Sequence, residues 1–170
     1  MKALVLVGPS GVGCTSVAQE IGARTGASVW DLAEQVATLL EVPAEMAIVA
    51  VGEQRYREAE RQVAVRLLRQ LQSEGGVLAM GSGCLRDEGV CAALAALRQA
   101  GGRTVALACS VRRLATRNGL DAPRSIALGT VHHQFTQMLK AREAECRELA
   151  DAIVDTTDTT VQQAVDLVLG

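Results

Sequence analysis

Short continuous apolar runs alternate along this chain with longer stretches in which apolar residues recur every three or four positions. The runs are typical of buried parallel strands, and the longer stretches are typical of amphipathic helices. We predict strands at 4–7, 28–30, 77–80, 104–109 and 152–154. The predicted helices cover 15–25, 32–40, 44–50, 53–73, 88–99 and 131–149, with a short helix from 111 and a last one from about 160.

Strands that alternate with helices build a parallel sheet covered on both faces, because each crossover returns the chain to the same edge. The predicted fold class is therefore α/β in three layers, with a five-stranded, mostly parallel sheet. The polar stretch 118–123 contains a glycine and a proline and is expected to be irregular. Neither repeats nor linkers divide the sequence, so we expect a single domain over 1–170.

The chain carries 17 basic and 19 acidic residues, a net charge of −2, and only three aromatic residues. It therefore lacks the basic field and the stacking platform that a nucleic-acid partner requires. The five cysteines are odd in number and form no CxxC pair, which favours reduced thiols over disulfides or a zinc site. The opening apolar run is too short for a signal peptide, and no stretch approaches the ~20 apolar residues of a transmembrane helix. We expect a cytoplasmic protein without a membrane partner.

Residues 8–15 match the phosphate-binding pattern G-x-x-x-x-G-K-[ST] except that Cys14 replaces the lysine. The pattern follows a predicted strand and precedes a predicted helix, where glycines let backbone N–H groups surround a phosphate. Thr15 would offer its hydroxyl to Mg²⁺, whereas a thiol at Cys14 cannot bring the charge of a lysine. The alternative is a glycine turn that joins strand to helix and binds no ligand.

Several arginines lie where an anion could meet them. Arg142 falls on the apolar face of the last long predicted helix, so it needs either an internal carboxylate or a bound ligand. Arg57 and Glu60 form an i, i+3 pair, and this spacing by itself favours a solvated ion pair. Arg117 and Arg124 flank the polar stretch, which suits either a lid that brings cations over a polyphosphate or a solvated loop.

Two strand ends carry further candidates. Asp31 ends the second strand, where it could hold Mg²⁺ through water and also cap the next helix, with Glu34 completing a capping box. The tripeptide Gly81-Ser82-Gly83 follows the third strand, at the edge where ligands bind in open α/β sheets. It either approaches a ligand or forms a bare turn.

Together these segments resemble the shikimate kinases, almost without gaps over the whole chain. The matching segments are the family's P-loop at 8–15, its Asp-x-Asp at 31–33, its G-E-x-x-[FY]-R-x-x-E at 52–60, its triple-glycine turn at 81–83, its two lid arginines at Arg117 and Arg124, and its last arginine at Arg142.

The resemblance implies a P-loop kinase fold with a lid at about 112–130, and phosphorylation of the 3-hydroxyl of shikimate by ATP with Mg²⁺. It assigns ATP to Gly8, Gly11, Val12, Gly13, Cys14, Thr15, Ser16 and Arg117, and Mg²⁺ to Thr15 and Asp31. It assigns shikimate to Arg57 and Arg142 at the carboxylate, and to Ala33, Glu60, Gly81, Ser82 and Gly83. The implied catalytic residues are Asp31 and Arg124, the latter at the transferring phosphoryl group.

The sequence departs from the family at the reacting centre. Cys14 replaces the P-loop lysine, Ala33 replaces the second aspartate, and Ser82 replaces the middle glycine. In the lid signature, Ser125 replaces a proline. The leading hypothesis is therefore a shikimate-kinase-like protein with weak or lost activity, expected to be a monomer.

Three alternatives stay open. The first is a working kinase with a rewired site, on shikimate or on another small hydroxy acid. The second is a non-catalytic binding or regulatory partner of a pathway enzyme. The third is a redox-sensitive thiol at Cys14, activated by the N-terminus of the following helix.

Overall fold

A computed structural model describes residues 1–118 and 126–170, with the side chains of the second range described from residue 133 onward. Five strands form one sheet in the order β2-β3-β1-β4-β5, and all four strand pairs are parallel. The predicted α/β class and the five-stranded sheet are thereby confirmed. The strands are β1 (Leu4–Val7), β2 (Val29–Asp31), β3 (Val77–Ala79), β4 (Arg103–Ala108) and β5 (Ala152–Asp155).

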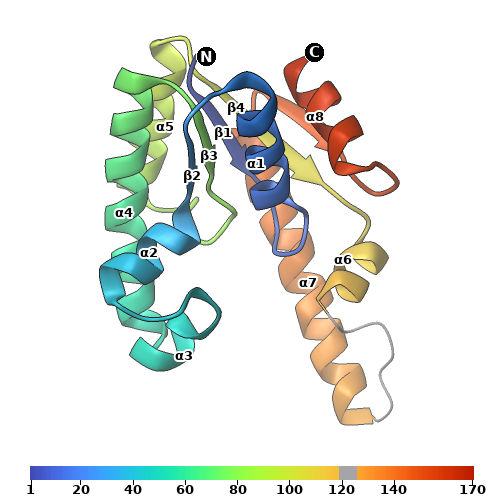
Figure 1. Ribbon diagram of the computed structural model, residues 1–170. Helices are drawn as coiled ribbons and strands as arrows, with labels where there is room; N and C mark the ends of the chain where they lie inside the picture. Colours follow the sequence, from blue (N-terminus) through green and yellow to red (C-terminus); the bar gives the residue numbers. More distant parts are fainter. Residues whose placement is uncertain (119–125) are drawn as a thin grey trace.

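Helices connect the strands and cover both faces of the sheet (Figure 1). Most lie within a residue of their predicted bounds, and the predicted helix 44–50 resolves into a 3-10 turn, η1, followed by α3. They are α1 (Cys14–Thr25), α2 (Leu32–Leu40), η1 (Ala44–Met46), α3 (Ala47–Val51), α4 (Glu53–Glu74), α5 (Glu88–Gln99), α6 (Val111–Arg117), α7 (Ile126–Leu149) and α8 (Val161–Leu169).

The start of α7 was predicted wrongly. The helix begins at Ile126, five residues before the predicted start at 131. Its first turns contain Gly129, whose poor helix propensity costs about 1 kcal/mol, an amount that a helix of 24 residues tolerates.

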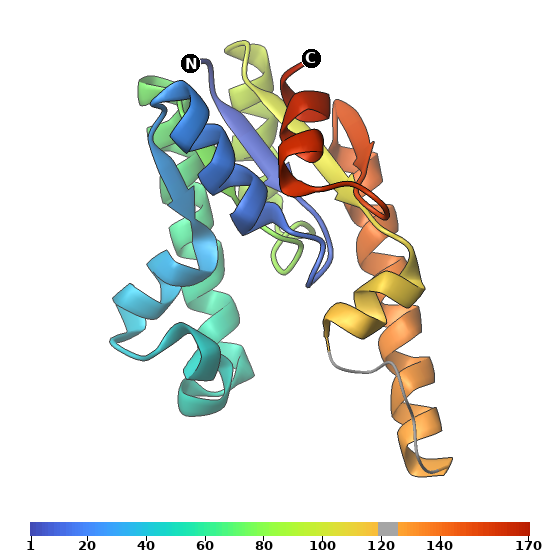
Figure 2. The same ribbon diagram turned by 45° about the vertical axis from the view of Figure 1, so that its right-hand side comes forward.

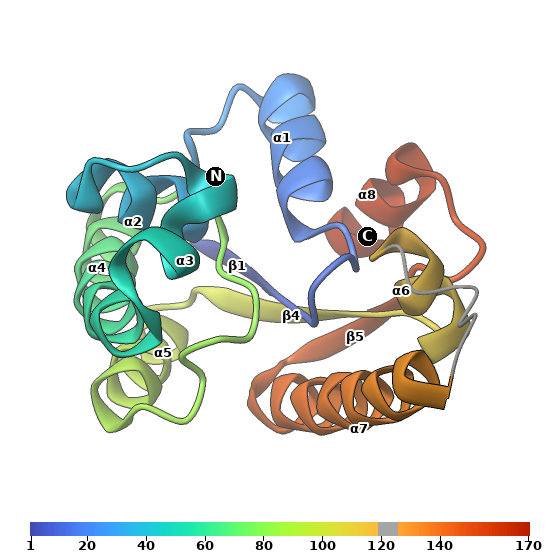
Figure 3. The ribbon, with the colours of Figure 1, turned by 90° about the horizontal axis from the view of Figure 1, so that it is seen from below.

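The core lies on both faces of the sheet. Side chains alternate along a strand, so β1 sends Leu4 and Leu6 to one face and Val5 and Val7 to the other. The first pair packs with α1 and α8, and the second pair packs with α4 and α5. Figure 3 shows α1 and α8 on one side of the sheet and α5 and α7 on the other. Burial on both faces explains why these strands are continuous apolar runs in the sequence.

The carboxyl ends of β1, β2 and β3 meet at one edge of the sheet. They deliver the P-loop, Asp31 and the turn that starts at Gly81 to the same place. Beyond this edge, α2, α3 and the start of α4 extend on one side and α6 and α7 on the other (Figure 2). Within the described residues, none of the helices combines the length and the apolar character needed to cross a membrane.

Candidate functional site

A cavity of about 670 Å³ opens at the carboxyl edge of the sheet, between these two sets of helices. It is the place where ligands bind in open α/β sheets. Arg124 lies outside the described residues, and Val12 is buried and does not line the cavity. All the other site residues predicted from the sequence line the cavity: Gly8, Gly11, Gly13, Cys14, Thr15, Ser16, Asp31, Ala33, Arg57, Glu60, Gly81, Ser82, Gly83, Arg117 and Arg142.

The P-loop has the backbone form of an anion-binding turn. Gly11 and Gly13 adopt φ angles of 81° and 107°, in the left-handed region that favours glycine. Gly13 is the N-cap of α1 and, among the described residues, no side chain caps this helix. Its first backbone N–H groups therefore lack side-chain partners at the positive end of the helix, which is suited to a phosphate.

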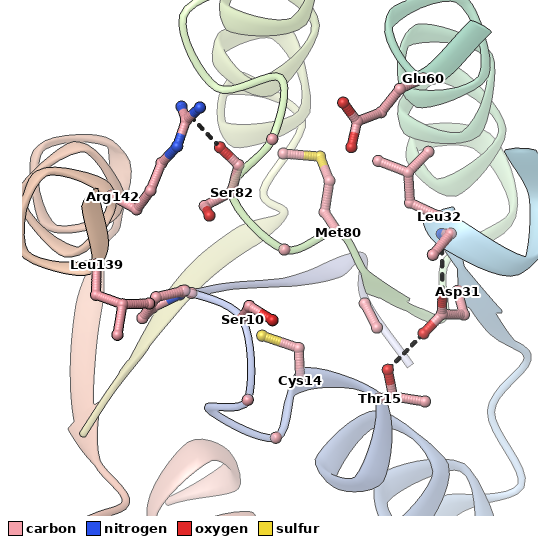
Figure 4. Close-up of a pocket in the computed structure, with 18 of the residues that line it drawn as sticks. Ser10, Cys14, Thr15, Asp31, Leu32, Glu60, Met80, Ser82, Leu139 and Arg142 are labelled. Atoms are coloured by element: carbon pink, nitrogen blue, oxygen red, sulfur yellow. Dashed lines mark hydrogen bonds between the residues drawn. The ribbon is translucent and has the colours of Figure 1, made fainter. Parts of the chain in front are cut away.

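Cys14 stands at the first residue of α1, and its sulfur points toward the P-loop (Figure 4). Its side chain is buried, and this burial, with a smaller contribution from Cys146, raises the pKa of the thiol to about 12. A backbone hydrogen bond from Gly81 opposes this increase and does not cancel it. The thiol is therefore neutral near pH 7, which argues against the redox-sensitive thiolate considered from the sequence.

Asp31 connects the P-loop helix to α2. Thr15 Oγ1 donates a hydrogen bond to Asp31 Oδ2 at 2.6 Å (Figure 4). The other carboxylate oxygen accepts from the backbone N–H groups of Ala33 and Glu34, at 2.9 and 3.2 Å. Asp31 is therefore the N-cap of α2, as predicted, and it still directs one oxygen toward the P-loop. The predicted capping box is not formed: among the described residues, the Glu34 side chain does not accept from the backbone N–H of Asp31. A hydroxyl and a carboxylate oxygen side by side are the kind of ligands that Mg²⁺ prefers.

The Arg57–Glu60 pair on α4 is less exposed than its spacing suggested. Arg57 Nη1 donates to Glu60 Oε2 at 2.7 Å, and only 8% of the Glu60 side chain is exposed. The guanidinium lies 5.5 Å from the centre of the Tyr56 ring. Gly83 allows this arrangement, since a Cβ at its position would collide with Arg57 and Glu60. Burial at the cavity wall, rather than the i, i+3 spacing, distinguishes this pair from a solvated one.

Arg142 on α7 has the internal carboxylate that its position required. Its Nη1 donates to Glu145 Oε2 at 3.0 Å. It also donates to the backbone oxygen of Ser82 at 3.4 Å (Figure 4). Arg86 Nε contacts the second oxygen of Glu145 at 2.6 Å. The sequence analysis did not identify Glu145 or Arg86, although Glu145 repeats the i, i+3 spacing of the Arg57–Glu60 pair.

The end of α6 packs against the P-loop. Arg117 Nη1 donates to the backbone oxygens of Gly11 and Val12, at 3.2 and 3.3 Å. Asn118 Nδ2 donates to the backbone oxygen of Ser10 at 3.1 Å, and Ser10 Oγ donates back to Asn118 Oδ1 at 3.2 Å. Sequence reasoning missed Asn118 as a functional candidate because it appeared only as a residue of a polar stretch.

A second, smaller cavity of about 220 Å³ lies on the other side of the P-loop glycines. Val12, Ser16 and Arg117 line it, together with Thr156 and the start of α8. The P-loop thus separates a large cavity that holds the arginines of α4 and α7 from a small one at α8. This arrangement can bind a phosphate chain at the P-loop and a carboxylate at the arginines.

Comparisons with known proteins agree with this geometry. The family model described as shikimate kinase matches residues 10–169. The chain is 32% identical over 166 residues to a shikimate kinase of Streptomyces coelicolor, covering 98% of this chain and 92% of the relative. It is 30% identical over 164 residues to one of Thermobifida fusca, covering 96% and 91%.

Solved structures show the same fold. A shikimate kinase from Acinetobacter baumannii in complex with shikimate aligns with a TM-score of 0.73 and 22% identity, over 99% of this chain and 89% of that one. One from Aquifex aeolicus aligns with a TM-score of 0.72 and 18% identity, over 98% and 93%. From the family match, the sequence relatives and the fold, we conclude that this chain belongs to the shikimate kinase family.

Proposed function

We propose that this protein binds shikimate, or a closely similar hydroxy acid, together with ATP and Mg²⁺, and transfers the terminal phosphoryl group to the 3-hydroxyl slowly. One observation carries the proposal: the two arginines suited to a carboxylate face the cavity, while the P-loop beside them presents the neutral thiol of Cys14. The substrate-binding side of the site is therefore retained, and the side that stabilises the transferring phosphoryl group is weakened.

The phosphate chain of ATP fits the P-loop. Backbone N–H groups at the start of α1 would hold the phosphates, and the small cavity beside Arg117 would accept the nucleoside part. No lysine lines either cavity among the described residues: Lys2 and Lys140 lie elsewhere. Backbone groups would thus bind the β- and γ-phosphates without the ammonium of a P-loop lysine. The family resemblance assigns Arg124 to the transferring phosphoryl group.

Mg²⁺ fits the Thr15–Asp31 pair, whose two oxygens lie 2.6 Å apart. These residues would hold the ion directly or through water, and a bound Mg²⁺ would neutralise charge on the phosphates. α1 has no acidic residue in its first turn, so no carboxylate there would repel the phosphate chain.

The acceptor would bind with its carboxylate at Arg57 and Arg142. Its hydroxyls would then face Gly81, Ser82 and Gly83. Asp31 and Glu60 are the carboxylates that line the cavity among the described residues, and Glu60 is already paired with Arg57. Asp31 is therefore the carboxylate left to accept the proton of the attacking hydroxyl. Its oxygens already accept from Thr15 and from the backbone N–H groups of Ala33 and Glu34, so it is a poor substitute for the aspartate that Ala33 replaces.

The expected rate follows from the two groups that are missing. Loss of one preorganised electrostatic group costs roughly 10²–10³ in rate, and loss of a general base costs roughly 10²–10⁴. Because such losses overlap, the effects are not simply multiplied. A kinase that normally turns over at ~1–100 s⁻¹ would fall well below one turnover per second. Glu34 offers no replacement base, since it is exposed and does not line the cavity.

Binding and turnover are tested separately. Calorimetric titration of shikimate and of ATP with Mg²⁺ into the purified protein measures each affinity, and a coupled assay measures turnover. We expect shikimate binding, weak ATP binding and slow turnover. Turnover in the ordinary range of ~1–100 s⁻¹ would contradict the reduced rate. Shikimate binding without ATP binding would instead favour the non-catalytic role.

A pair of substitutions tests the cause of the low rate. The double variant Cys14→Lys with Ala33→Asp restores an ammonium and a carboxylate, and we expect a gain in kcat of at least about 10². Cys14→Ser with Ala33→Ser is the matched control, because it changes the same positions without adding charge. An equal kcat for both double variants and the unmodified protein would point to a rewired site.

A further inference from the structure

Glu145 on α7 connects two arginines that belong to different parts of the chain. One of its oxygens accepts from Arg142 at 3.0 Å, and the other contacts Arg86 Nε at 2.6 Å. Only 11% of the Glu145 side chain is exposed. Arg86 lies in the turn that follows Gly83, so Glu145 also fastens this turn to α7. A carboxylate this well buried and shared by two guanidinium groups fixes the position of both.

Of these three residues, only Arg142 lines the large cavity. Arg86 has 77% of its side chain exposed, and Glu145 contacts Arg142 without lining the cavity. Within the part of the chain that the structure describes, Arg142 uses Nη1 for Glu145 and for Ser82. Its Nε and Nη2 donors remain for a carboxylate in the cavity, which is the bidentate arrangement that arginine favours.

The two arginines of the cavity differ in how much of their charge is already compensated. Arg57 faces two carboxylates, Glu60 at 2.7 Å and Glu53 at 4.0 Å. Among the described residues, Glu145 is the one carboxylate that contacts Arg142, and it also pairs with Arg86. Arg86, Glu145 and Arg142 together therefore carry a net charge of +1. Arg57 together with Glu60 and Glu53 carries no net positive charge. The positive charge available to a bound anion is concentrated at Arg142.

We propose that Glu145 and Arg86 are positioning residues that set the affinity of Arg142 for the carboxylate of the ligand, although neither touches it. Glu145 orients Arg142 and weakens its attraction for an anion. Arg86 partly neutralises Glu145 and so restores that attraction. The inference rests on the proposed function only in assigning the ligand carboxylate to Arg142.

The test measures Kd for shikimate by calorimetry. Glu145→Gln keeps an oxygen for Arg142 and removes the charge, so we expect Kd to fall about three- to tenfold, in line with a partly screened ion pair. Arg86→Gln leaves the charge of Glu145 to Arg142 alone, so Kd should rise about two- to fivefold. The double variant should behave as Glu145→Gln, because Arg86 acts only through Glu145.

A neutral ligand separates electrostatic control from support of the turn. The methyl ester of shikimate should bind every variant with unchanged Kd, since it carries no carboxylate charge. Glu143→Gln is the matched control: it removes the same charge from α7, where Glu143 pairs with Arg147 at 2.7 Å, and it should leave Kd for shikimate within about twofold.

The outcomes distinguish this inference from the proposed function. Shikimate binding that is equal in the unmodified protein, Glu145→Gln and Arg86→Gln overturns the inference alone, as do parallel changes in the affinity for the ester. Binding by Glu145→Gln but not by the unmodified protein supports it. If no variant binds shikimate, the proposed function fails. A double-mutant cycle without ligand then tests whether Arg86 and Glu145 are coupled. If the decreases in Tm of Arg86→Gln and Glu145→Gln simply add in the double variant, the two residues are not coupled and the inference is overturned.

Discussion

At the scale of single residues, Cys14 has the largest chemical consequence. The backbone around it keeps the left-handed glycines and the free helix N-terminus of a phosphate-binding turn. Its thiol is buried and its pKa is raised to about 12, so the loop meets a phosphate with backbone N–H groups and a neutral side chain. In the proposed function, phosphate binding by the loop is thereby separated from stabilisation of the transferring charge.

The protonation of Cys14 can be measured by alkylation. A thiol of pKa about 12 holds about 10³-fold less thiolate near neutral pH than one at the ordinary value of 9.0, so Cys14 should react very slowly with iodoacetamide. Cys91, which is only half-buried, should be labelled first. Peptide mass spectrometry over time at pH 7.5 gives both rates. Faster labelling of Cys14 than of Cys91 would revive the reactive-thiol alternative.

Gly83 is the residue that allows the buried Arg57–Glu60 pair to approach the turn after β3. A methyl group at this position would displace the pair, so we expect Gly83→Ala to weaken shikimate binding about tenfold, equivalent to about 1.4 kcal/mol. Ser73→Ala is the control, because Ser73 does not line the cavity and its hydroxyl bonds to backbone oxygens of its own helix. A Kd for Gly83→Ala within twofold of that of the control would show that the pair does not bind the ligand.

At the scale of elements, the end of α6 holds the P-loop. Arg117 and Asn118 together engage the backbone oxygens of Ser10, Gly11 and Val12. Asn118 also ends its own helix by donating to Leu114. The conformation of the P-loop is therefore supported from outside by a helix more than one hundred residues away in sequence.

Removal of the Asn118 side chain should loosen this contact. Asn118→Ala loses the reciprocal hydrogen bonds with Ser10, each worth about 1 kcal/mol, so amide hydrogen exchange across 10–13 should quicken roughly tenfold. Thr116→Ala is the matched control on the same helix, because its hydroxyl bonds only to Arg112. Exchange in the P-loop that is the same for the two variants would contradict the supporting role of Asn118.

At the scale of the whole molecule, three buried thiols make stability depend on alkaline pH. Burial raises the pKa of Cys14, Cys84 and Cys146 to about 12, from an ordinary value of 9.0. The folded state therefore keeps protons that the unfolded state releases above pH 9. The stabilisation is complete below pH 9 and is lost as pH rises toward 12.

Denaturant unfolding under reducing conditions tests this dependence. Between pH 8 and pH 10, the free energy of unfolding should fall by on the order of 1 kcal/mol for each of the three thiols. A variant with alanine at Cys14, Cys84 and Cys146 should show a much shallower dependence, whereas Cys91→Ala should retain the full one. An unchanged slope in the triple variant would mean that other groups cause the loss.

The fold class and the local parts of the site could be predicted from the sequence. Continuous apolar runs are typical of strands buried on both faces, so five strands in a mostly parallel sheet could be predicted, although their order in the sheet was not. The P-loop and the cap at Asp31 are built from neighbouring residues and were recognisable for the same reason. The start of α7 could not be predicted correctly, because the apolar periodicity in the sequence begins later than the helix does.

Which charges are buried, and which groups they contact, could not be predicted from the sequence and depends on the packing in three dimensions. The spacing of Arg57 and Glu60 is equally compatible with a solvated pair and with a buried one. The packing of the pair against Gly83 shows that it is buried. Glu145 and Arg86 are 59 residues apart, and only the packing of α7 on the turn after β3 joins them. Burial and electrostatic contact depend on distance in space, which hydrophobic periodicity along the chain does not contain.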